Sequence, residues 1–156
     1  MKLPIVEAGE EHIDGIGRLE EICFCASWIR GMIARQVKDK NQVFLCAMDG
    51  DRAAGYAGFS YVLDEGYVGN VAVDPCWQRQ GVGGDLVDAM IRKARQLGLA
   101  FLTLEVRRGN APARALYESR GFREVGVRKN YYEKPVEDAI LMTVWLREKS
   151  GDESAF

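Results

Sequence analysis

The sequence predicts an α+β domain with three layers (α/β/α) around one mixed, mostly antiparallel central sheet. Two observations predict this class: short apolar runs of strand length outnumber the helical stripes, and the two kinds do not alternate one by one. A third observation is a glycine-rich loop at 78–84 that opens the clearest amphipathic helix. The expected order is β-α-α-β-β-β-α-β-α-β-β, which differs from the strict alternation of a doubly wound fold.

The first half of the chain is expected to hold a strand, two helices and three further strands. Apolar residues at helical spacing predict the first helix, and Ser27 is the expected cap of the second. Turns are predicted at 49–51 and at 64–66, where Asp, Glu and Gly gather. The predicted ranges are 3–8, 10–24, 28–38, 42–48, 52–63 and 67–73.

The second half begins with the helix that opens near Gly83 and stops at Gly98. Asn110 is the expected cap of a short helix over 111–119, and Pro112 is tolerated in its first turn. Strands are predicted over 101–106, 122–127 and 139–146. We therefore expect one domain over 1–148, followed by a polar tail over 149–156.

Composition excludes several classes of protein. The 156 residues are 47% hydrophobic and 28% charged with a net charge of -2, so a nucleic-acid partner, which calls for a basic face, is not expected. The apolar stretches are shorter than the roughly 20 residues that a membrane helix needs. The four cysteines and one histidine do not make a zinc pattern. Because no signal peptide is recognised, the cysteines are expected to be free thiols in the cytoplasm.

The most informative segment runs from Val71 to Gly84. A buried strand ends, Pro75 turns the chain, and glycines then allow the backbone to approach an anion at the start of a helix. Arg79 adds a positive charge. The Walker A string is absent, and Leu86 stands where a dinucleotide fingerprint needs its third glycine, so neither of those nucleotide sites is expected.

The string Gln78-x-x-Gly81-x-Gly83 after Val-Ala-Val-Asp-Pro resembles the acetyl-coenzyme A loop of the GNAT N-acetyltransferase superfamily. The resemblance implies the GNAT fold and acetyl-coenzyme A as the acetyl donor. No metal is expected, because the cysteines and the single histidine do not make a zinc pattern. The resemblance also implies a set of cofactor-binding residues: Val71, Ala72, Val73, Arg79, Gln80, Gly81, Val82, Gly83, Gly84 and Asn110.

Later segments resemble one subfamily more closely. The Asn-Tyr-Tyr string at 130–132 and Glu-Asp-Ala at 137–139 are similar to the RimI-type enzymes, which acetylate the N-terminal alanine of a bacterial ribosomal protein. Two departures stand out. Gly84 occupies a position where these enzymes often carry a basic residue, so one phosphate contact is expected to be missing. Cys25-Ala26 replaces a common Phe-Pro pair near the acceptor.

Acetyl transfer needs a neutral amine, donors for the developing oxyanion, and a proton for the leaving thiolate. The resemblance implies Glu105 as the general base and Tyr117 as the acid. From spacing alone, Glu105 could equally be a solvated strand residue. The alternative for Tyr117 is a core aromatic, which is the more common place for a helix tyrosine. The backbone of the 71–73 strand is expected to bind the thioester end and to supply an oxyanion donor.

The acceptor side is expected to hold Tyr131, Tyr132, Glu137 and Asp138. Together with the acids at 64 and 65, the last two predict an acidic mouth for a basic peptide terminus. The leading hypothesis is thus a cytoplasmic acetyltransferase of a protein N-terminus, working as a monomer or weak dimer. The alternatives are a GNAT enzyme for a small amine and a non-catalytic coenzyme A-binding regulator. Whether lysine side chains are also acetylated is left open.

Overall fold

The computed structural model describes residues 2–24 and 30–147. The expected helix cap at Ser27 and the predicted tail over 149–156 lie outside this range. The predicted order of elements is confirmed. The elements are β1 (Ile5–Glu7), η1 (Glu10–His12), α1 (Ile13–Phe24), α2 (Arg30–Lys38), β2 (Gln42–Asp49), β3 (Arg52–Val62), β4 (Glu65–Val73), η2 (Pro75–Trp77), α3 (Val82–Gln96), β5 (Phe101–Arg107), α4 (Ala111–Ser119), β6 (Arg123–Tyr132) and β7 (Glu137–Trp145).

The seven strands form one sheet in the order β1-β2-β3-β4-β5-β7-β6. Every pair is antiparallel except β4–β5, which is parallel because α3 crosses over between them. The α+β class with a mixed, mostly antiparallel sheet is therefore confirmed.

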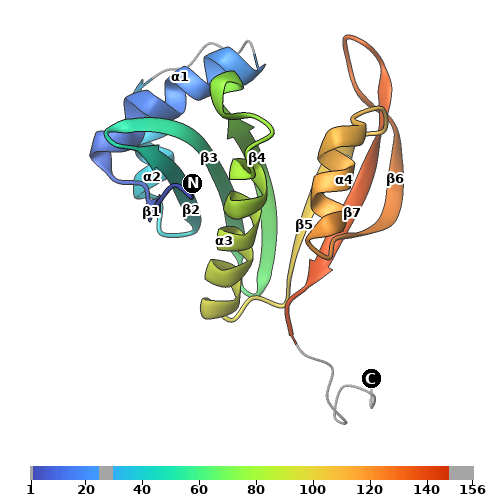
Figure 1. The fold of residues 1–156 in the computed structure, drawn as a ribbon. Helices are drawn as coiled ribbons and strands as arrows, with labels where there is room; N and C mark the ends of the chain where they lie inside the picture. Colours follow the sequence, from blue (N-terminus) through green and yellow to red (C-terminus); the bar gives the residue numbers. More distant parts are fainter. Residues whose placement is uncertain (1, 25–29, 148–156) are drawn as a thin grey trace.

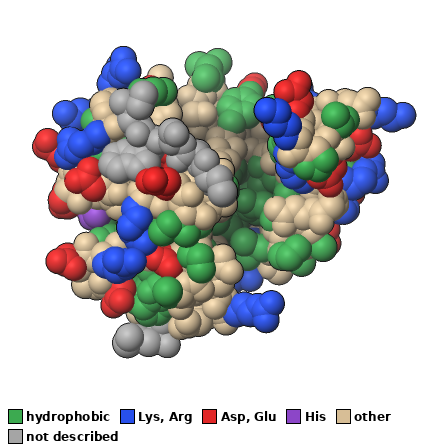
Figure 2. All heavy atoms as spheres, turned by 90° about the horizontal axis from the view of Figure 1, so that it is seen from above, with side chains coloured by type: hydrophobic (Ala, Val, Ile, Leu, Met, Phe, Trp, Pro, Cys, Tyr) green, Lys and Arg blue, Asp and Glu red, His purple; other side chains and the backbone are tan. Residues whose placement is uncertain are grey.

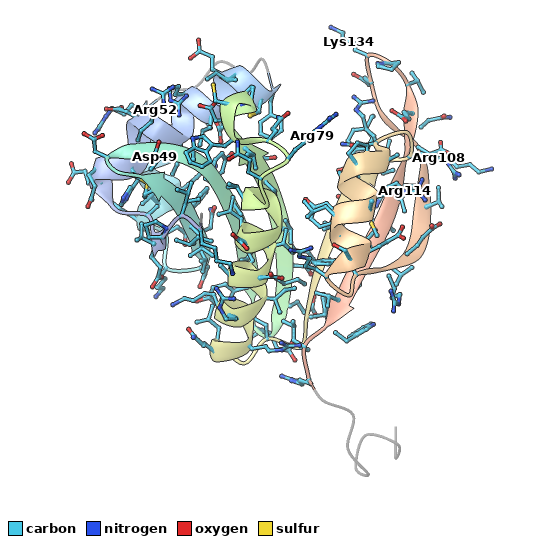
Figure 3. All side chains as sticks on the ribbon, in the orientation of Figure 1. Asp49, Arg52, Arg79, Arg108, Arg114 and Lys134 are labelled. Carbon is cyan, nitrogen blue, oxygen red and sulfur yellow. The ribbon has the colours of Figure 1, made fainter. Side chains whose placement is uncertain are left out.

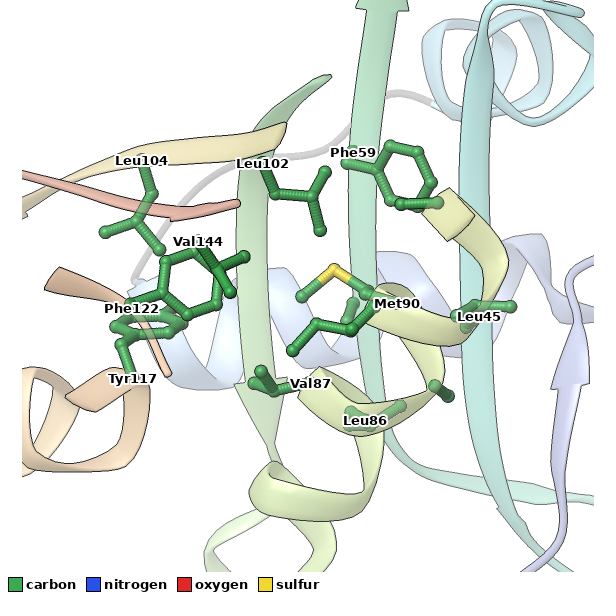
Figure 4. Close-up of a cluster of buried hydrophobic side chains, with 14 of the residues drawn as sticks. Leu45, Phe59, Leu86, Val87, Met90, Leu102, Leu104, Tyr117, Phe122 and Val144 are labelled. Atoms are coloured by element: carbon green, nitrogen blue, oxygen red, sulfur yellow. The ribbon is translucent and has the colours of Figure 1, made fainter. Parts of the chain in front are cut away.

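Helices cover both faces of this sheet (Figure 1). On one face α1 packs its buried Ile13, Ile16 and Leu19 against Cys46 and Tyr56 of the sheet. On the other face α3 and α4 share a larger core with the strands (Figure 4). The residues of that core drawn together in Figure 4 include Leu86, Val87, Met90, Leu102, Leu104, Phe122 and Val144.

The strands β4 and β5 begin side by side and then separate (Figure 1). Their pairing joins Glu65–Tyr67 to Phe101–Thr103 and does not continue toward the C-terminal ends. On its other edge β4 stays paired with β3 as far as Val73. Because a buried edge must find polar partners, the open edge of β4 near Val73 is suited to an extended ligand.

The strand predicted over 122–127 is displaced and too short. Phe122 precedes β6, is fully buried, and packs edge-on against Tyr117 with ring centroids 5.3 Å apart. The strand itself runs from Arg123 to Tyr132, and most of its residues are exposed because it lies at the edge of the sheet. A strand with two solvated sides shows no apolar alternation, so its length is not visible in the sequence pattern.

The turn predicted at 64–66 is also wrong by one position. The chain reverses at Leu63–Asp64, and β4 already begins at Glu65. Gly66 is buried inside the strand, where an added Cβ would lie 2.6 Å from the Leu102 side chain. This glycine therefore serves the close approach of β4 to β5 rather than a turn.

None of the described helices has both the length and the hydropathy required to cross a membrane.

Candidate active site

The loop that follows β4 is fixed by Asp74, whose side chain is only 5% exposed. Its Oδ1 accepts the Cys76 backbone N–H at 2.9 Å, which caps η2, and its Oδ2 accepts Arg18 Nη1 of α1 at 2.8 Å. The Arg18 hydrogen bond is the main reason that the pKa of Asp74 is lowered. Asp74 thus joins the start of the loop to the helix layer on the opposite face of the sheet.

The glycine-rich loop turns sharply before α3. Gly81 is the N-cap residue with φ of 85°, a left-handed conformation that glycine adopts without strain, and Arg79 has φ of 63°. The first backbone N–H groups of a helix have no acceptor within it. Figure 3 shows Arg79 extending from this loop into the space between the two halves of the molecule. The loop therefore presents backbone donors and one cationic side chain at the same place.

A cavity of about 560 Å³ lies between this loop and α4. Figure 2 shows the hollow from above, with hydrophobic side chains along much of its wall. The loop forms its polar side, while Trp77, Pro112 and Leu116 contribute apolar surface. Its lining includes seven residues that the sequence predicts as cofactor-binding: Val73, Arg79, Gly81, Val82, Gly83, Gly84 and Asn110.

Three predicted cofactor residues do not line this cavity with their side chains. Val71 packs against the larger core, and Ala72 is 2% exposed within the α1 cluster. Both belong to the open edge of β4, so their expected contribution is from the backbone. Gln80 turns away and donates from Nε2 to the Cys76 carbonyl at 3.2 Å. Gln78 and Trp77 line the cavity in its place.

The cavity combines one cationic side chain and the backbone of the glycine-rich loop with apolar surface along α4. A Cβ at Gly83 would already lie 3.4 Å from Leu116 and 3.7 Å from Val73, so a side chain there would narrow the passage between α3 and α4. Asn110 accepts the Ala113 N–H at 3.2 Å through Oδ1, which confirms it as the α4 cap. Asn110 also lines the cavity.

Glu105 lies on the opposite side of β5 from this core. Leu104 and Val106 on either side of it are buried under α3 and α4, so alternation turns Glu105 to the other face. Its Oε2 lies 2.9 Å from Arg128 Nε, and its Oε1 accepts the Tyr131 hydroxyl at 3.3 Å. The side chain remains 30% exposed, so the carboxylate is held in place and still accessible.

Tyr132 lies near this carboxylate, whereas Tyr117 belongs to the core on the opposite face of the sheet and does not itself line the larger cavity. Arg107 stacks on the Tyr132 ring at 4.4 Å, and the pKa of Tyr132 is raised chiefly by burial and then by Glu105. Burial, with a smaller contribution from Tyr132, raises the pKa of Tyr117 to about 12. The Tyr117 phenol therefore keeps its proton at neutral pH, as a proton donor must.

Glu137 and Asp138, predicted on the acceptor side, have partners within the chain. Glu137 accepts the Gly109 N–H at 2.6 Å and lies 3.2 Å from Arg107 Nη1. Asp138 lies 3.5 Å from Arg108 and accepts the Asn130 N–H at 2.9 Å. These contacts tie the β6–β7 hairpin to the end of β5, so the two charges are largely balanced locally.

The predicted acidic mouth is not formed as a single cluster. Asp64 pairs with Arg147 at 3.1 Å, and Glu65 is level with Phe101 at the start of β5. Asp138, by contrast, is next to Ala139, which pairs with Arg107 at the far end of β5. The intervening length of β5 corresponds to about 20 Å at the usual rise per residue. The acids at 64 and 65 therefore lie away from the site.

A second, smaller cavity of about 140 Å³ was not expected from the sequence. It lies between α1, α2 and the sheet, and Glu20, Tyr56 and Asn70 meet in its wall. The Tyr56 hydroxyl donates to Glu20 Oε2 at 2.8 Å and accepts Asn70 Nδ2 at 3.2 Å. No local pattern marks these three residues, because they come from separate elements.

This second cavity shares a face of the sheet with Glu105. Tyr67 lines it and is level with Thr103 across the parallel pair β4–β5. Side chains of paired residues point to the same face, and Glu105 is two residues beyond Thr103 on that face. The larger cavity and the Glu105 cluster thus approach the separation between β4 and β5 from opposite faces.

The model of the acetyltransferase (GNAT) family matches residues 13–122, which is more than half of the chain. The chain belongs to this family. Its fold and its glycine-rich loop are therefore those of a GNAT acetyltransferase. In the described part of this GNAT chain, no group of three or more His, Cys, Asp and Glu side chains is arranged to hold a metal ion.

Curated relatives of this GNAT chain carry one recurring name. The [ribosomal protein bS18]-alanine N-acetyltransferase of Escherichia coli K12 is 40% identical over 128 residues, which are 81% of this chain and 86% of the relative. The protein of that name from Haemophilus ducreyi is 32% identical over 140 residues, 88% of this chain and 96% of the relative.

Solved structures give the same picture of the fold. The ribosomal-protein-S18-alanine N-acetyltransferase of Escherichia coli superposes with a TM-score of 0.85 at 32% identity, covering 96% of this chain and 97% of that one. An aminoglycoside 6'-acetyltransferase superposes with a TM-score of 0.82 at 16% identity, covering 95% and 100%. At that identity the likeness concerns the GNAT fold alone, so the fold does not decide the acceptor.

Proposed function

We propose that this GNAT enzyme transfers the acetyl group of acetyl-coenzyme A to the N-terminal α-amine of a ribosomal protein in the cytoplasm. The observation that carries the proposal is the separation of β4 from β5, which the donor cavity approaches on one face and the Glu105 cluster on the other. This acceptor is supported by relatives that are named [ribosomal protein bS18]-alanine N-acetyltransferase and that align over more than 80% of their length.

Acetyl-coenzyme A supplies the thioester, which is the activated acyl group. The loop around Gly81 and Gly83 would hold the diphosphate through backbone N–H groups, with Arg79 beside it. The open edge of β4 at Val71–Val73 would orient the arm and present an N–H to the developing oxyanion. The apolar wall formed by Trp77, Pro112 and Leu116 would exclude water from the arm.

The acceptor would enter from the Glu105 face. The amine nitrogen attacks the thioester carbonyl carbon, a C–N bond forms and the C–S bond breaks. Glu105 takes the amine proton, directly or through a water, and Tyr117 gives a proton to the leaving sulfur. An α-amine has a pKa near 7.7–8.0 against about 10.4 for lysine, so it makes the smaller demand on the base.

Replacing Tyr117 with Phe should lower kcat by about tenfold to a hundredfold, because the leaving thiolate loses its proton donor. This loss of kcat is expected at the low end of the usual contribution of a general acid, because a thiolate leaves more readily than an alkoxide. Steady-state kinetics at pH 7 would measure it. The ring packing against Phe122 is kept in the variant, so the thermal midpoint should stay close to that of the wild type. An unchanged kcat would remove Tyr117 from the mechanism.

The cavity at Glu20 is a candidate subsite for a basic side chain close to the acceptor amine. Replacing Glu20 with Gln should raise KM about threefold to tenfold for a peptide with Arg in its first residues, because a partly exposed charge-assisted contact is lost. The same peptide with Ala replacing that Arg should show no such rise. If both peptides respond equally, the carboxylate does not read the side chain.

The acceptor itself can be identified by mass. Peptides that begin with alanine and carry the N-terminal sequence of the bS18 protein from the same organism should gain one acetyl group on the α-amine. A peptide blocked at the N-terminus but retaining its lysines tests side-chain transfer. Acetylation of polyamines or aminoglycosides in preference to the free peptide would favour the small-amine alternative. Binding of coenzyme A without turnover of any amine would favour a regulator.

A further inference from the structure

Arg120, the C-cap residue of α4, lies against the first turn of α3. Its guanidinium occupies the space next to Gly84, where an added Cβ would overlap it. Its Nε lies 3.3 Å from Asp88 Oδ1, and its Nη1 donates to Ser119 Oγ at 3.0 Å. The side chain of Arg120 thus takes the place that a side chain at position 84 would otherwise fill.

This position continues the wall of the donor cavity. Gly84 lines the cavity on the α3 side, and Ala113 and Leu116 line it on the α4 side. Arg120 comes four residues after Leu116, so it follows on the same face of α4. Arg120 does not itself line the cavity, but its side chain is 30% exposed and lies beside Gly84, which does.

The charge at this place is unusual for a helix start. The N-terminus of α3 already carries the positive end of the helix dipole, so a cation beside it is unfavourable unless an anion is present. Asp88 offsets part of the charge but is 43% exposed, and Asp85 is engaged with Lys2 at 3.7 Å. With Arg79, the loop therefore gathers two guanidinium groups around a helix start. A multiply charged anion, such as the phosphates of coenzyme A, satisfies this arrangement.

We infer that Arg120 is a phosphate-binding residue for the acetyl donor, and that it supplies from α4 the positive charge that Gly84 cannot supply from α3. The inference rests on the proposed donor. The phosphate contact that Gly84 cannot make is thus provided from α4. Because Gly84 has no side chain, the Arg120 guanidinium can occupy the space beside it.

The test is the affinity for coenzyme A, measured by calorimetry on the full chain at low salt. Arg120→Leu should raise Kd about five- to twentyfold, because a charge-assisted contact is lost, and the difference should shrink at high salt. It should also raise KM for acetyl-coenzyme A while leaving kcat at saturating donor unchanged. The double variant Gly84→Arg with Arg120→Leu, which restores a cation from α3, should return Kd to within about threefold of the wild type.

Asp88→Asn is the matched control, because it removes the ion pair between α3 and α4 while keeping the Arg120 charge. It should leave Kd unchanged or lower it. If Asp88→Asn weakens binding as much as Arg120→Leu, or if the double variant gives no recovery, Arg120 is only a tie between helices and the inference is wrong. Arg120→Gln serves the same comparison if the Leu variant does not fold.

Dephospho-coenzyme A separates the possible phosphate contacts. Loss of the Arg120→Leu effect with this probe assigns the contact to the 3'-phosphate, and persistence of the effect assigns it to the diphosphate; either result supports the inference. A wild-type chain that fails to bind coenzyme A contradicts the proposed donor itself. A wild type that binds while Arg120→Leu binds equally well contradicts only the role of Arg120.

Discussion

Glu105→Gln should lower kcat by about 10²- to 10⁴-fold, the usual contribution of a general base, with little change in the affinity for coenzyme A. The amide keeps the size of the side chain but cannot take a proton from the attacking amine. The deficit should narrow as the pH rises past 8, since a growing share of the α-amine is then already neutral. Initial rates between pH 6.5 and 9.5 would measure both effects.

Glu118→Gln is a suitable control, because Glu118 is an exposed residue of α4 that lines neither the larger cavity nor the one at Glu20. It should behave as the wild type at every pH. If Glu105→Gln retains full activity at pH 7, the base is another group or the solvent, and Glu105 then serves only to hold Arg128 and Tyr131.

Gly81→Val should raise Kd for coenzyme A at least about 100-fold and lower the free energy of unfolding by about 1–2 kcal/mol. The second effect follows from φ of 85°, which a residue with a Cβ adopts only with strain. The first follows because the new side chain holds the phosphates away from the loop, and the loss of two charge-assisted hydrogen bonds is enough for a change of this size. Calorimetry and chemical denaturation give the two quantities.

Gly50 provides the control for backbone strain. It has φ of 63° in the β2–β3 turn, and a Cβ there would meet no other atom within 4 Å, as at Gly81. Gly50→Val should therefore lose a similar amount of stability and keep its affinity for coenzyme A. Equal loss of affinity in the two variants would mean that general destabilisation, and not the loop, weakens binding.

The acids of the β6–β7 hairpin show how tertiary partners alter a reading from sequence. Glu137 and Asp138 are predicted as charges for a basic acceptor, but each is engaged by an arginine of the β5–α4 region. Nothing local in the sequence indicates that Arg107 contacts Glu137 or that Arg128 contacts Glu105. Glu20, the carboxylate of the second cavity, lies on an amphipathic helix in which a polar residue is ordinary. The sequence pattern therefore does not mark it as a site residue.

The sequence by itself determined the order of elements, the Asn110 cap and the loop from Gln78 to Gly84, because each depends on residues that are neighbours in the chain. Turn chemistry, helix caps and apolar periodicity act over a few residues and are readable there. The resemblance carried by that loop and by later strings extended this to the family, which the match over 13–122 confirms.

Only the tertiary structure decided the separation of β4 from β5, the long edge strand β6, and the meeting of Glu105 with Arg128 and Tyr131. It likewise placed Arg120 in the space left by Gly84, 36 positions earlier in the chain. These features depend on register and on side chains from distant segments packing together. A local pattern specifies which face a residue takes, but not which residue it meets across that face.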